Sequence, residues 1–596
     1  MKKLFRLFFV IFSIFVLVSC GGNNEDPSQD NESVTDGDGA SVALRMLRDA
    51  DSGCTGMELD CLAQNIAAIG FQIRNGAGET IFSKSVPREK LKNLNEELKG
   101  IKNAENATLL VAIYLGTDMT TPKWQGKTTG LKFEKGKETK ATILLYPTAT
   151  QSKEIAMPEK LTTARFGHSS TVLGDGRVLV AGGFASCGDN GKCVATESVE
   201  IIDIESGKVE PLATMTEKRA MHTAVALNDG SVLFIGGVQG FSASQQEEAF
   251  EGYPVLPYSQ IGAVKTIERY MPSYPKFNMK ENGYGTPIAN YTEPISAENI
   301  PFMTFQSILT KRISDSQIDV FLVGGVDETG KPSNKAYKFT ITDSTAEGGS
   351  VAIDQLTELK ESSSPMLLPA LAYSNGAVFA LGGRPAGSAK TTRDATDETT
   401  DEPAEDPTEE PTEEPTEEPG KTTIVASIIS ENESKDIEAD PSNNIFFANS
   451  IALDNALYTF GGMPNKSGNI ENSKENTVIR KWNTEDGSSP NPQTAITSSN
   501  DKNVAFAETL YDSKNNRFIV IGGANAENFY QVIDATTLEW FQGAPSHTMS
   551  DKRIMPKASI VPAGIIGEKP ILVITGGTSA LDSAGSAANT IKINLL

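Results

Sequence analysis

Short apolar runs separated by turn residues make up much of the chain beyond residue 150. Residues 169–173 and 178–181 are two such runs, and Asp175-Gly176 lies between them. Both turn residues tolerate a positive φ, as the centre of a tight hairpin turn requires. The second run ends in Gly182-Gly183, which indicates a backbone that turns sharply or lies against another backbone. The pattern predicts a β-hairpin that ends in a glycine pair.

The same hairpin recurs along the chain. Residues 219–237 repeat it, with Arg219 and His222 standing 54 positions after Arg165 and His168. Successive glycine pairs are separated by 54, 88, 58, 79, 61 and 54 residues. The seven pairs begin at Gly182, Gly236, Gly324, Gly382, Gly461, Gly522 and Gly576. Regular recurrence of this kind predicts tandem structural repeats.

A period near 50 residues, with Gly-Gly closing the second strand, resembles the kelch repeat. The resemblance covers about residues 151–596, and the family's Tyr and Trp pair survives most clearly as Glu539-Trp540. It implies blades of four antiparallel strands. The expected fold is therefore all-β, with a seven-bladed kelch-type β-propeller over residues 148–596.

A third strand is expected after each glycine pair. These strands are expected over residues 198–204, 265–271, 336–341, 423–429, 477–482, 530–533 and 590–595. The last one ends the chain, so the seventh blade has no fourth strand of its own. A spare strand over residues 153–157 precedes the first repeat. We expect it to complete the seventh blade, which would leave no open sheet edge in the ring.

Three elaborations follow a second strand and should decorate one face of the propeller. They cover residues 184–196, 238–263 and 384–421. The third repeats Pro-Thr-Glu-Glu three times and carries thirteen acidic residues and no basic one between positions 394 and 418. Like charges and prolines disfavour a packed core, so this insertion is expected to be disordered. A solvated spacer is favoured over a calcium-binding or cation-binding role.

Residues 1–20 have the composition of an export signal. Three basic residues precede an apolar run over residues 7–18, which is too short for a stable membrane span. Leu17-Val18-Ser19-Cys20 resembles the bacterial lipobox, which implies cleavage before Cys20 and attachment of acyl chains such as palmitate to it. By the same resemblance, Gly21 favours sorting to the outer membrane. An ordinary secretory signal with a chance cysteine is the alternative.

A disordered tether over residues 21–40 is expected to lead into a small β-rich module over residues 41–147. Its candidate strands cover residues 42–47, 69–74, 80–85, 108–115, 130–134 and 140–145. Residues 87–99 suit one short helix. We interpret the module as an immunoglobulin-like or transthyretin-like sandwich without chemistry of its own.

Net charge and cysteine content indicate the class of partner and the cellular compartment. The 596-residue chain has a formal net charge of −24, which argues against a nucleic-acid partner because phosphate binding needs a basic face. Besides Cys20 there are four cysteines, in two close pairs: Cys54 with Cys61, and Cys187 with Cys193. Outside the cytosol these are expected to form two disulfides. Two zinc half-sites are the disfavoured alternative.

The three histidines do not form an evident site. His168 and His222 share one repeat position, which favours packing or hydrogen bonding between blades. Galactose-oxidase-type enzymes carry kelch-like propellers with a copper ion that needs imidazole ligands. Such a site would require His168 and His222 to meet, or one of them to meet His547. No metal or other cofactor is expected.

Two further groups are candidate binding residues. Arg165 and Arg219 lie just before a first strand, where arginines of sialic-acid-processing relatives can meet a carboxylate. Salt bridges between blades are the alternative. Tyr253, Tyr258 and Tyr284 lie in an aromatic-rich stretch over residues 250–305. Aromatic rings stack on sugars and anchor protein interfaces, but they can equally pack an insertion against its blade.

The sequence contains no phosphate-binding glycine loop, Gly-x-Ser-x-Gly elbow or His-Glu-x-x-His motif in a convincing context. We therefore expect a non-enzymatic, monomeric lipoprotein of the bacterial outer membrane. Its insertion-bearing face would bind a protein or a glycan. A carbohydrate-active enzyme on the same fold, sialic-acid-epimerase-like or galactose-oxidase-like, is the alternative.

Overall fold

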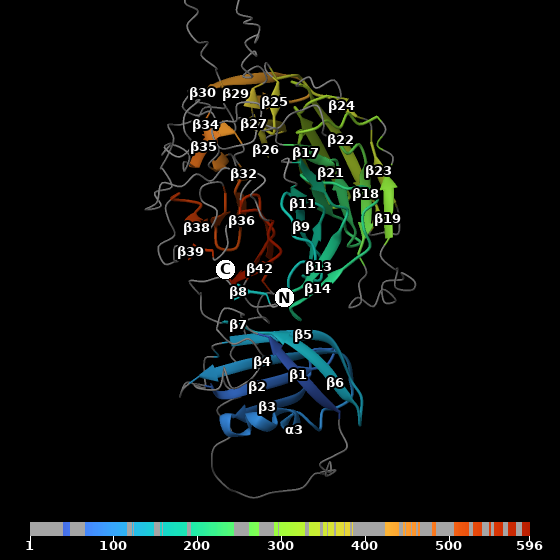
Figure 1. Cartoon of the computed structure of the whole chain (residues 1–596), viewed down its shortest axis with the longest axis vertical. Helices are drawn as coiled ribbons and strands as arrows, with labels where there is room; N and C mark the ends of the chain where they lie inside the picture. The colour runs from blue at the N-terminus through green and yellow to red at the C-terminus, as the bar shows by residue number, and fades with distance from the viewer. Residues whose placement is uncertain are drawn as a thin grey trace, which may run out of the picture.

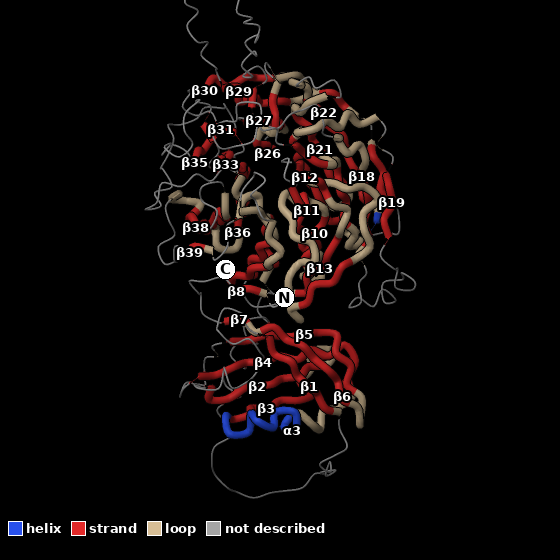
Figure 2. The backbone as a smooth tube through the Cα atoms, in the orientation of Figure 1, coloured by secondary structure: helices blue, strands red, loops and turns tan. Residues whose placement is uncertain are grey.

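Strands dominate the computed structural model of the chain, as Figure 2 shows in red. The structure describes residues 40–47, 66–115, 124–147 and most of 155–595. The longest stretches that it leaves out are 1–39, 48–65, 243–261, 273–290, 386–423, 465–478 and 484–505. No helix within the described ranges is long and apolar enough to cross a membrane. The predicted signal peptide, tether and acidic insertion lie outside the described residues.

The first part of the chain is a small β module. Its five-stranded sheet has the order β3-β2-β4-β5-β7, and a parallel pair, β1 and β6, lies beside it. The strands are β1 (Ser41–Leu47), β2 (Ile66–Arg74), β3 (Thr80–Pro87), β4 (Ala104–Leu115), β5 (Trp124–Phe133), β6 (Glu138–Leu144) and β7 (Tyr146–Pro147). The expected helix is present as η2 (Arg88–Asn93) followed by α3 (Leu94–Glu97). One apolar core joins both layers through residues such as Val42, Phe71 and Ile143.

Seven antiparallel sheets that make up a ring follow in the described part of residues 155–595, together with three smaller sheets. Their first strands are β9 (Ser169–Val172), β15 (Thr223–Ala226), β20 (Ser307–Ser314), β26 (Ala370–Ser374), β32 (Asn449–Leu453), β36 (Glu508–Asp512) and β40 (Lys557–Val561). Their second strands are β10 (Val178–Ala181), β16 (Val232–Ile235), β21 (Gln317–Val323), β27 (Ala377–Leu381), β33 (Ala456–Phe460), β37 (Arg517–Ile521) and β41 (Ile571–Thr575). β10 and β16 are buried along their whole length, which explains their unbroken apolar sequences.

The third strands confirm all seven sequence-based expectations to within a few residues. They are β13 (Val199–Asp203), β18 (Ile267–Met271), β22 (Ala336–Asp343), β29 (Ile424–Ile429), β35 (Ile479–Asn483), β38 (Phe529–Asp534) and β42 (Ile591–Leu595). The outer strands are β14 (Lys208–Pro211), β19 (Tyr291–Ile295), β23 (Val351–Ile353) with β24 (Thr357–Glu358), β30 (Ser434–Ala439), β39 (His547–Thr548) and β8 (Ile155–Ala156). The fifth sheet has three strands within the described residues.

The sheets are arranged as a closed ring (Figure 1). Each first strand contacts the first strand of the next sheet, and β40 contacts β9. The seventh sheet is completed by β8, whose Ile155 pairs with Ile593 of β42. The backbone N–H of Met157 also donates to the carbonyl of Ile591, at 2.9 Å. The predicted closure by residues 153–157 is therefore confirmed, and the all-β fold is consistent with a β-propeller.

The two faces of the ring differ in what they carry. On the face where second strands lead to third strands, β11 (Phe184–Cys187), β12 (Lys192–Ala195) and β17 (Gly240–Ser242) form a separate small sheet. The N-terminal module contacts the opposite face. Lys127 Nζ donates to the carbonyl of Ile565 between β40 and β41, and Thr129 donates to Glu205 between β13 and β14. This small sheet, which includes the described part of residues 184–196, and the module thus lie on opposite faces of the ring.

Candidate functional site

The glycine pair is the place where each sheet meets the next. Gly182 and Gly183 both have a positive φ, and the N–H of Gly183 donates to the carbonyl of Arg219 in the second sheet, at 2.9 Å. A Cβ on Gly182 would lie 2.3 Å from that same oxygen. Only glycine combines this backbone conformation with this close approach.

The contact recurs around the ring. The second glycine donates to the next sheet from Gly325 to Met366, from Gly523 to Arg553, and from Gly577 back to Arg165. These distances are 2.9, 3.0 and 2.8 Å. The hydrogen bond from Gly577 joins the seventh sheet to the first. The Gly-Gly signature thus marks a repeated backbone hydrogen bond between neighbouring sheets.

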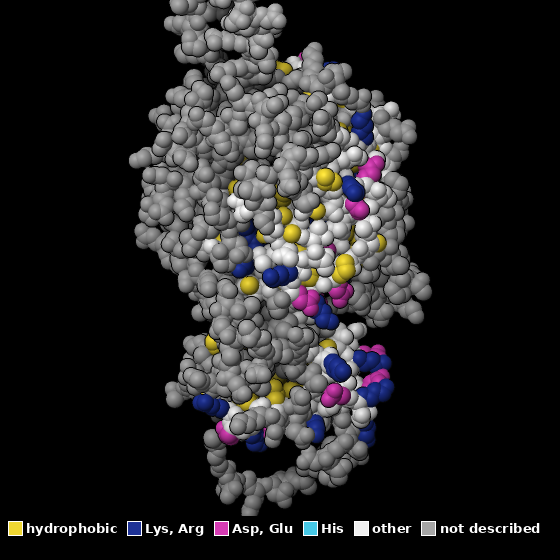
Figure 3. Space-filling view, in the orientation of Figure 1, with side chains coloured by type: hydrophobic (Ala, Val, Ile, Leu, Met, Phe, Trp, Pro, Cys, Tyr) yellow, Lys and Arg dark blue, Asp and Glu magenta, His cyan; other side chains and the backbone are white. Residues whose placement is uncertain are grey.

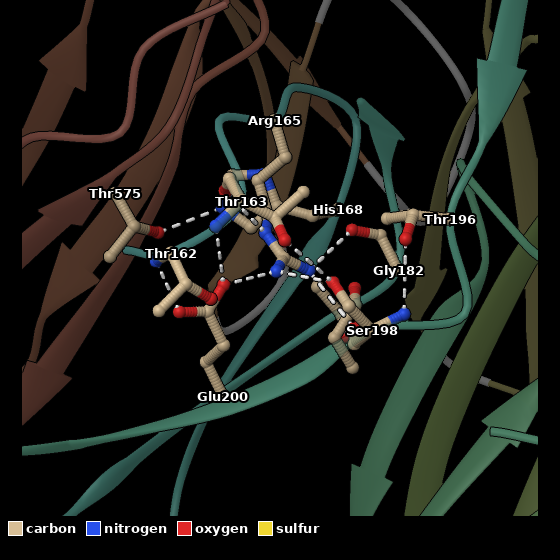
Figure 4. Close-up of polar contacts among 11 residues, drawn as sticks. Thr162, Thr163, Arg165, His168, Gly182, Thr196, Ser198, Glu200 and Thr575 are labelled. Carbon is tan, nitrogen blue, oxygen red and sulfur yellow. Dashed lines mark hydrogen bonds and ion pairs between the residues drawn. The ribbon is translucent and has the colours of Figure 1, made fainter. Parts of the chain in front are cut away.

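Arg165 is the centre of a buried polar network, which Figure 4 shows. Its Nη1 donates to the carbonyl oxygens of Gly182 and Ser198, at 2.8 and 3.0 Å. Its Nη2 forms an ion pair with Glu200 of β13, and neither side chain is exposed. Glu200 also accepts hydrogen bonds from the backbone N–H groups of Thr162 and Thr163. The network ties the segment before β9 to the third strand of the same sheet.

Arg219 repeats this network in the second sheet. It pairs with Glu268 of β18 at 3.2 Å and donates to the carbonyl of Gly236. Both arginines are fully buried, which corrects the expectation that Arg165 and Arg219 contact a ligand. The alternative of salt bridges between blades is also wrong. Each ion pair lies within one sheet, and the backbone makes the link between sheets. Burial lowers the pKa of Arg165, and Glu200 opposes that shift.

A third arginine of this kind escaped the sequence reasoning. Arg553 precedes β40 by four residues, as Arg165 precedes β9, and it is fully buried. It donates to the carbonyl of Gly576 and to both oxygens of Thr590. Lys592 occupies the position of Glu200, so the seventh sheet departs from the acidic pattern. The shared four-residue spacing from the first strand was the signal that could have identified it.

His168 and His222 also belong to this framework. His168 Nε2 lies 2.8 Å from Thr575 Oγ1 of the seventh sheet, and His222 Nε2 lies 2.9 Å from Ser169 Oγ of the first. Each ring packs against the first glycine of the preceding sheet. Burial, assisted by nearby positive charges such as Arg165, holds the pKa of both well below the usual 6.5. These contacts favour the predicted role in packing between sheets.

The buried histidines are poorly placed for catalysis or metal binding. The Ser169–His222 contact resembles half of a nucleophile–base pair, but both residues are buried and serve the contact between sheets. His547 lies on the outer strand β39, opposite Tyr530. Within the described ranges, no group of three or more His, Cys, Asp or Glu residues is placed to hold a metal ion.

Several predicted site residues lie outside the described residues: Cys20, Cys54, Cys61, Tyr253, Tyr258 and Tyr284. The structure does place the other cysteine pair. Cys187 and Cys193 are direct partners in the antiparallel register of β11 and β12. They belong to the small sheet on the insertion-bearing face.

A ring of left-handed residues surrounds the axis on that same face. Its members, each two residues before a first strand, are Gly167, Met221, Phe305, Leu368, Phe506 and Met555, with φ between 50° and 61°. Their backbones join across sheets: Met221 N–H donates to Gly167, Gly167 to Met555, and Met555 to Phe506. We call the apolar side chains of Met221, Phe305, Leu368, Phe506 and Met555 the collar. A left-handed backbone is not visible in the apolar pattern, so sequence reasoning missed it.

A family model described as the Kelch motif matches residues 165–216, which span the first sheet from Arg165 through β14. No curated protein matches the chain. The match supports a kelch-repeat protein. It covers the first sheet, which contains Arg165, His168 and the Gly182-Gly183 pair.

Proposed function

We propose that the chain is a non-enzymatic binding protein built on a seven-bladed kelch propeller. The Kelch motif suggests protein binding or scaffolding, and the seven-sheet ring is the frame. The observation that carries the proposal is the asymmetry of the two faces. One face contacts the N-terminal module, while the other carries β11, β12 and β17, which the ring does not need for closure. The partner is a protein or a glycan.

Exposed apolar residues provide one matched test position on each face of the ring. Among the described residues, the exposed large hydrophobic side chains are Val194 at 42% and Ile313 at 48%. Val194 lies on β12 of the insertion-bearing face, and Ile313 lies beside the turn between β20 and β21 on the opposite face. Figure 3 shows separate small groups of hydrophobic side chains with Lys or Arg side chains among them, rather than one broad apolar patch. We propose that the interface is centred on the small sheet of β11, β12 and β17, which elaborates one face alone.

The same proposal covers the N-terminal parts. Cys20 would be the acylated first residue of a lipoprotein in the bacterial outer membrane, and the tether would approach from the module side. The module would be an immunoglobulin-like or transthyretin-like sandwich. Cys187 and Cys193 would form one disulfide, because directly opposed residues of an antiparallel pair can meet disulfide geometry. Cys54 and Cys61 would form the other.

A pull-down from envelope extracts with matched surface variants tests the function. The full chain should retain a discrete partner. Val194→Glu should abolish its retention, because it places a charge in the proposed interface, whereas Ile313→Glu on the opposite face should not. Equal thermal stability of the two variants excludes a folding effect. Loss of the partner with Ile313→Glu alone would contradict the proposal.

Anchoring has its own test. Cys20→Ser should release the protein from the membrane fraction or leave it unprocessed, because no acyl chain can then be attached. Mass spectrometry of the N-terminus identifies the modification. Unchanged fractionation together with an unmodified N-terminus in the natural protein would exclude a lipid anchor.

A further inference from the structure

The collar residues occupy a backbone conformation that their side chains disfavour. A left-handed residue with a Cβ costs roughly 1–2 kcal/mol, and bulky apolar residues rarely adopt it. Glycine serves at the same position in the first sheet, as Gly167. Met221 and Met555 pack on one side against the buried cluster of Phe166, Phe184 and Val238. They nevertheless remain only partly buried, as do Leu368 and Phe506. Strain of this kind is commonly found where side chains are used in binding.

A lysine lies just inside the collar. Lys557 is the first residue of β40, two positions after Met555. Its ammonium donates to Glu508, the first residue of β36 in the sixth sheet, at 2.9 Å. Both residues begin first strands, and the first strands contact one another around the axis of the ring. The collar therefore surrounds a charged centre.

The exposed end of this ion pair is the cation. The Lys557 side chain is 39% exposed and that of Glu508 is 14% exposed. Other first-strand residues at this level are engaged in the framework: Ser307 Oγ donates to the carbonyl of Pro369, and Asn449 donates to the carbonyl of Ala507. An ammonium has three N–H donors, so Lys557 can donate to a second carboxylate as well as to Glu508.

An apolar ring around a partly exposed ammonium fits a ligand with an apolar group and a carboxylate on the same residue. In an extended peptide, neighbouring side chains point to opposite sides, so an apolar residue and an adjacent acidic residue would not both enter. The last residue of a chain carries both groups together. Resting on the proposed binding function, we propose that the collar binds the C-terminal end of a partner polypeptide, with its apolar side chain against Met221, Phe506 and Met555 and its α-carboxylate at Lys557.

Fluorescence polarisation with the full chain tests this inference. The probe is a dye-labelled Gly-Ser decapeptide that ends in Leu-Phe with a free carboxylate. The matched probes are its C-terminal amide and the same peptide ending in Ser-Ser. We expect saturable binding of the first probe, and binding at least about tenfold weaker for each of the others, equivalent to about 1.4 kcal/mol.

Two sets of variants separate binding from folding. Lys557→Met combined with Glu508→Gln should weaken binding about tenfold and abolish the difference between acid and amide, whereas Lys557→Arg should retain both. Met221→Asn with Met555→Asn should weaken binding while thermal stability is unchanged or higher, because asparagine tolerates the left-handed backbone. A fall in stability would instead show that the collar is a packing element.

Separate outcomes test the C-terminal specificity and the binding face. No saturable binding, or equal binding of acid and amide, would overturn the C-terminal specificity even if Val194→Glu still releases a partner. Loss of that partner on Ile313→Glu alone would contradict the binding face itself.

Discussion

At the scale of single residues, recurrence in sequence identified equivalent positions but not their environments. Arg165 and Arg219, like His168 and His222, were recognised as repeats, yet only the structure shows that the arginine–glutamate pairs are fully buried. Periodicity reports which positions correspond. It does not report whether a side chain points into a seam between sheets or out to solvent, because that depends on contacts between distant segments.

The glycine pair gives a direct prediction. Gly182→Ala should destabilise the protein by at least about 2 kcal/mol more than Gly376→Ala, because its Cβ would clash with the carbonyl of Arg219. Gly376 is the matched control: it also has a positive φ, of 83°, but a Cβ there meets nothing within 4 Å. Urea denaturation measures both. Equal losses would show that backbone conformation alone requires glycine.

The buried histidines predict sensitivity to acid. Their native pKa values lie well below 6.5, so below pH 6.5 the unfolded chain binds protons that the native state does not. Stability is therefore retained above pH 6.5 and lost as the pH falls, by up to about 2.7 kcal/mol per pH unit for two groups. Free energies of unfolding between pH 7 and 5 test this. His168→Gln with His222→Gln should flatten the slope, and an unchanged slope would assign the acid sensitivity to other groups.

The arginine–glutamate pair predicts strong coupling. Arg219→Met or Glu268→Met alone should cost about 3–5 kcal/mol, because either change leaves a buried charge without its partner. The double variant should recover part of that loss, and a double-mutant cycle measures the coupling. Additive losses would indicate that the two side chains stabilise the sheet independently.

At the scale of elements, the pattern of apolar residues predicted the positions of the strands in the ring. All seven third strands and the closing strand β8 lie where they were expected, because each pairs with a strand whose apolar run and turn residues are local signals. The collar and the small sheet of β11, β12 and β17 were not predicted. Their conformation is imposed by hydrogen bonds between segments that are far apart in sequence, such as that from Met221 to Gly167.

Ring closure gives a prediction at this scale. A chain that starts at residue 162 lacks β8 and the bond from Met157, so β42 would become an exposed edge. Compared with a chain that starts at residue 148, it should have a lower thermal midpoint and a greater tendency to associate. Light scattering and thermal unfolding of both fragments measure these properties. Equal behaviour would show that β8 does not secure the ring.

At the scale of the whole molecule, the central claim is that one face binds a partner while the opposite face meets the N-terminal module. The contacts of Lys127 and Thr129 define the module side, and β11, β12 and β17 define the other. Sequence reasoning could place the two on opposite faces because strand direction alternates in every sheet. It could not identify the partner, because no side-chain pattern on the insertions is specific to one chemistry.

Site-specific photo-cross-linking in living cells tests that claim most directly. A photoreactive residue replaces Val194 on the insertion-bearing face in one strain and Ile313 on the opposite face in another, since both positions are exposed. We expect a discrete cross-linked species from position 194 and none from position 313. A discrete species from position 313, with none from position 194, would contradict it.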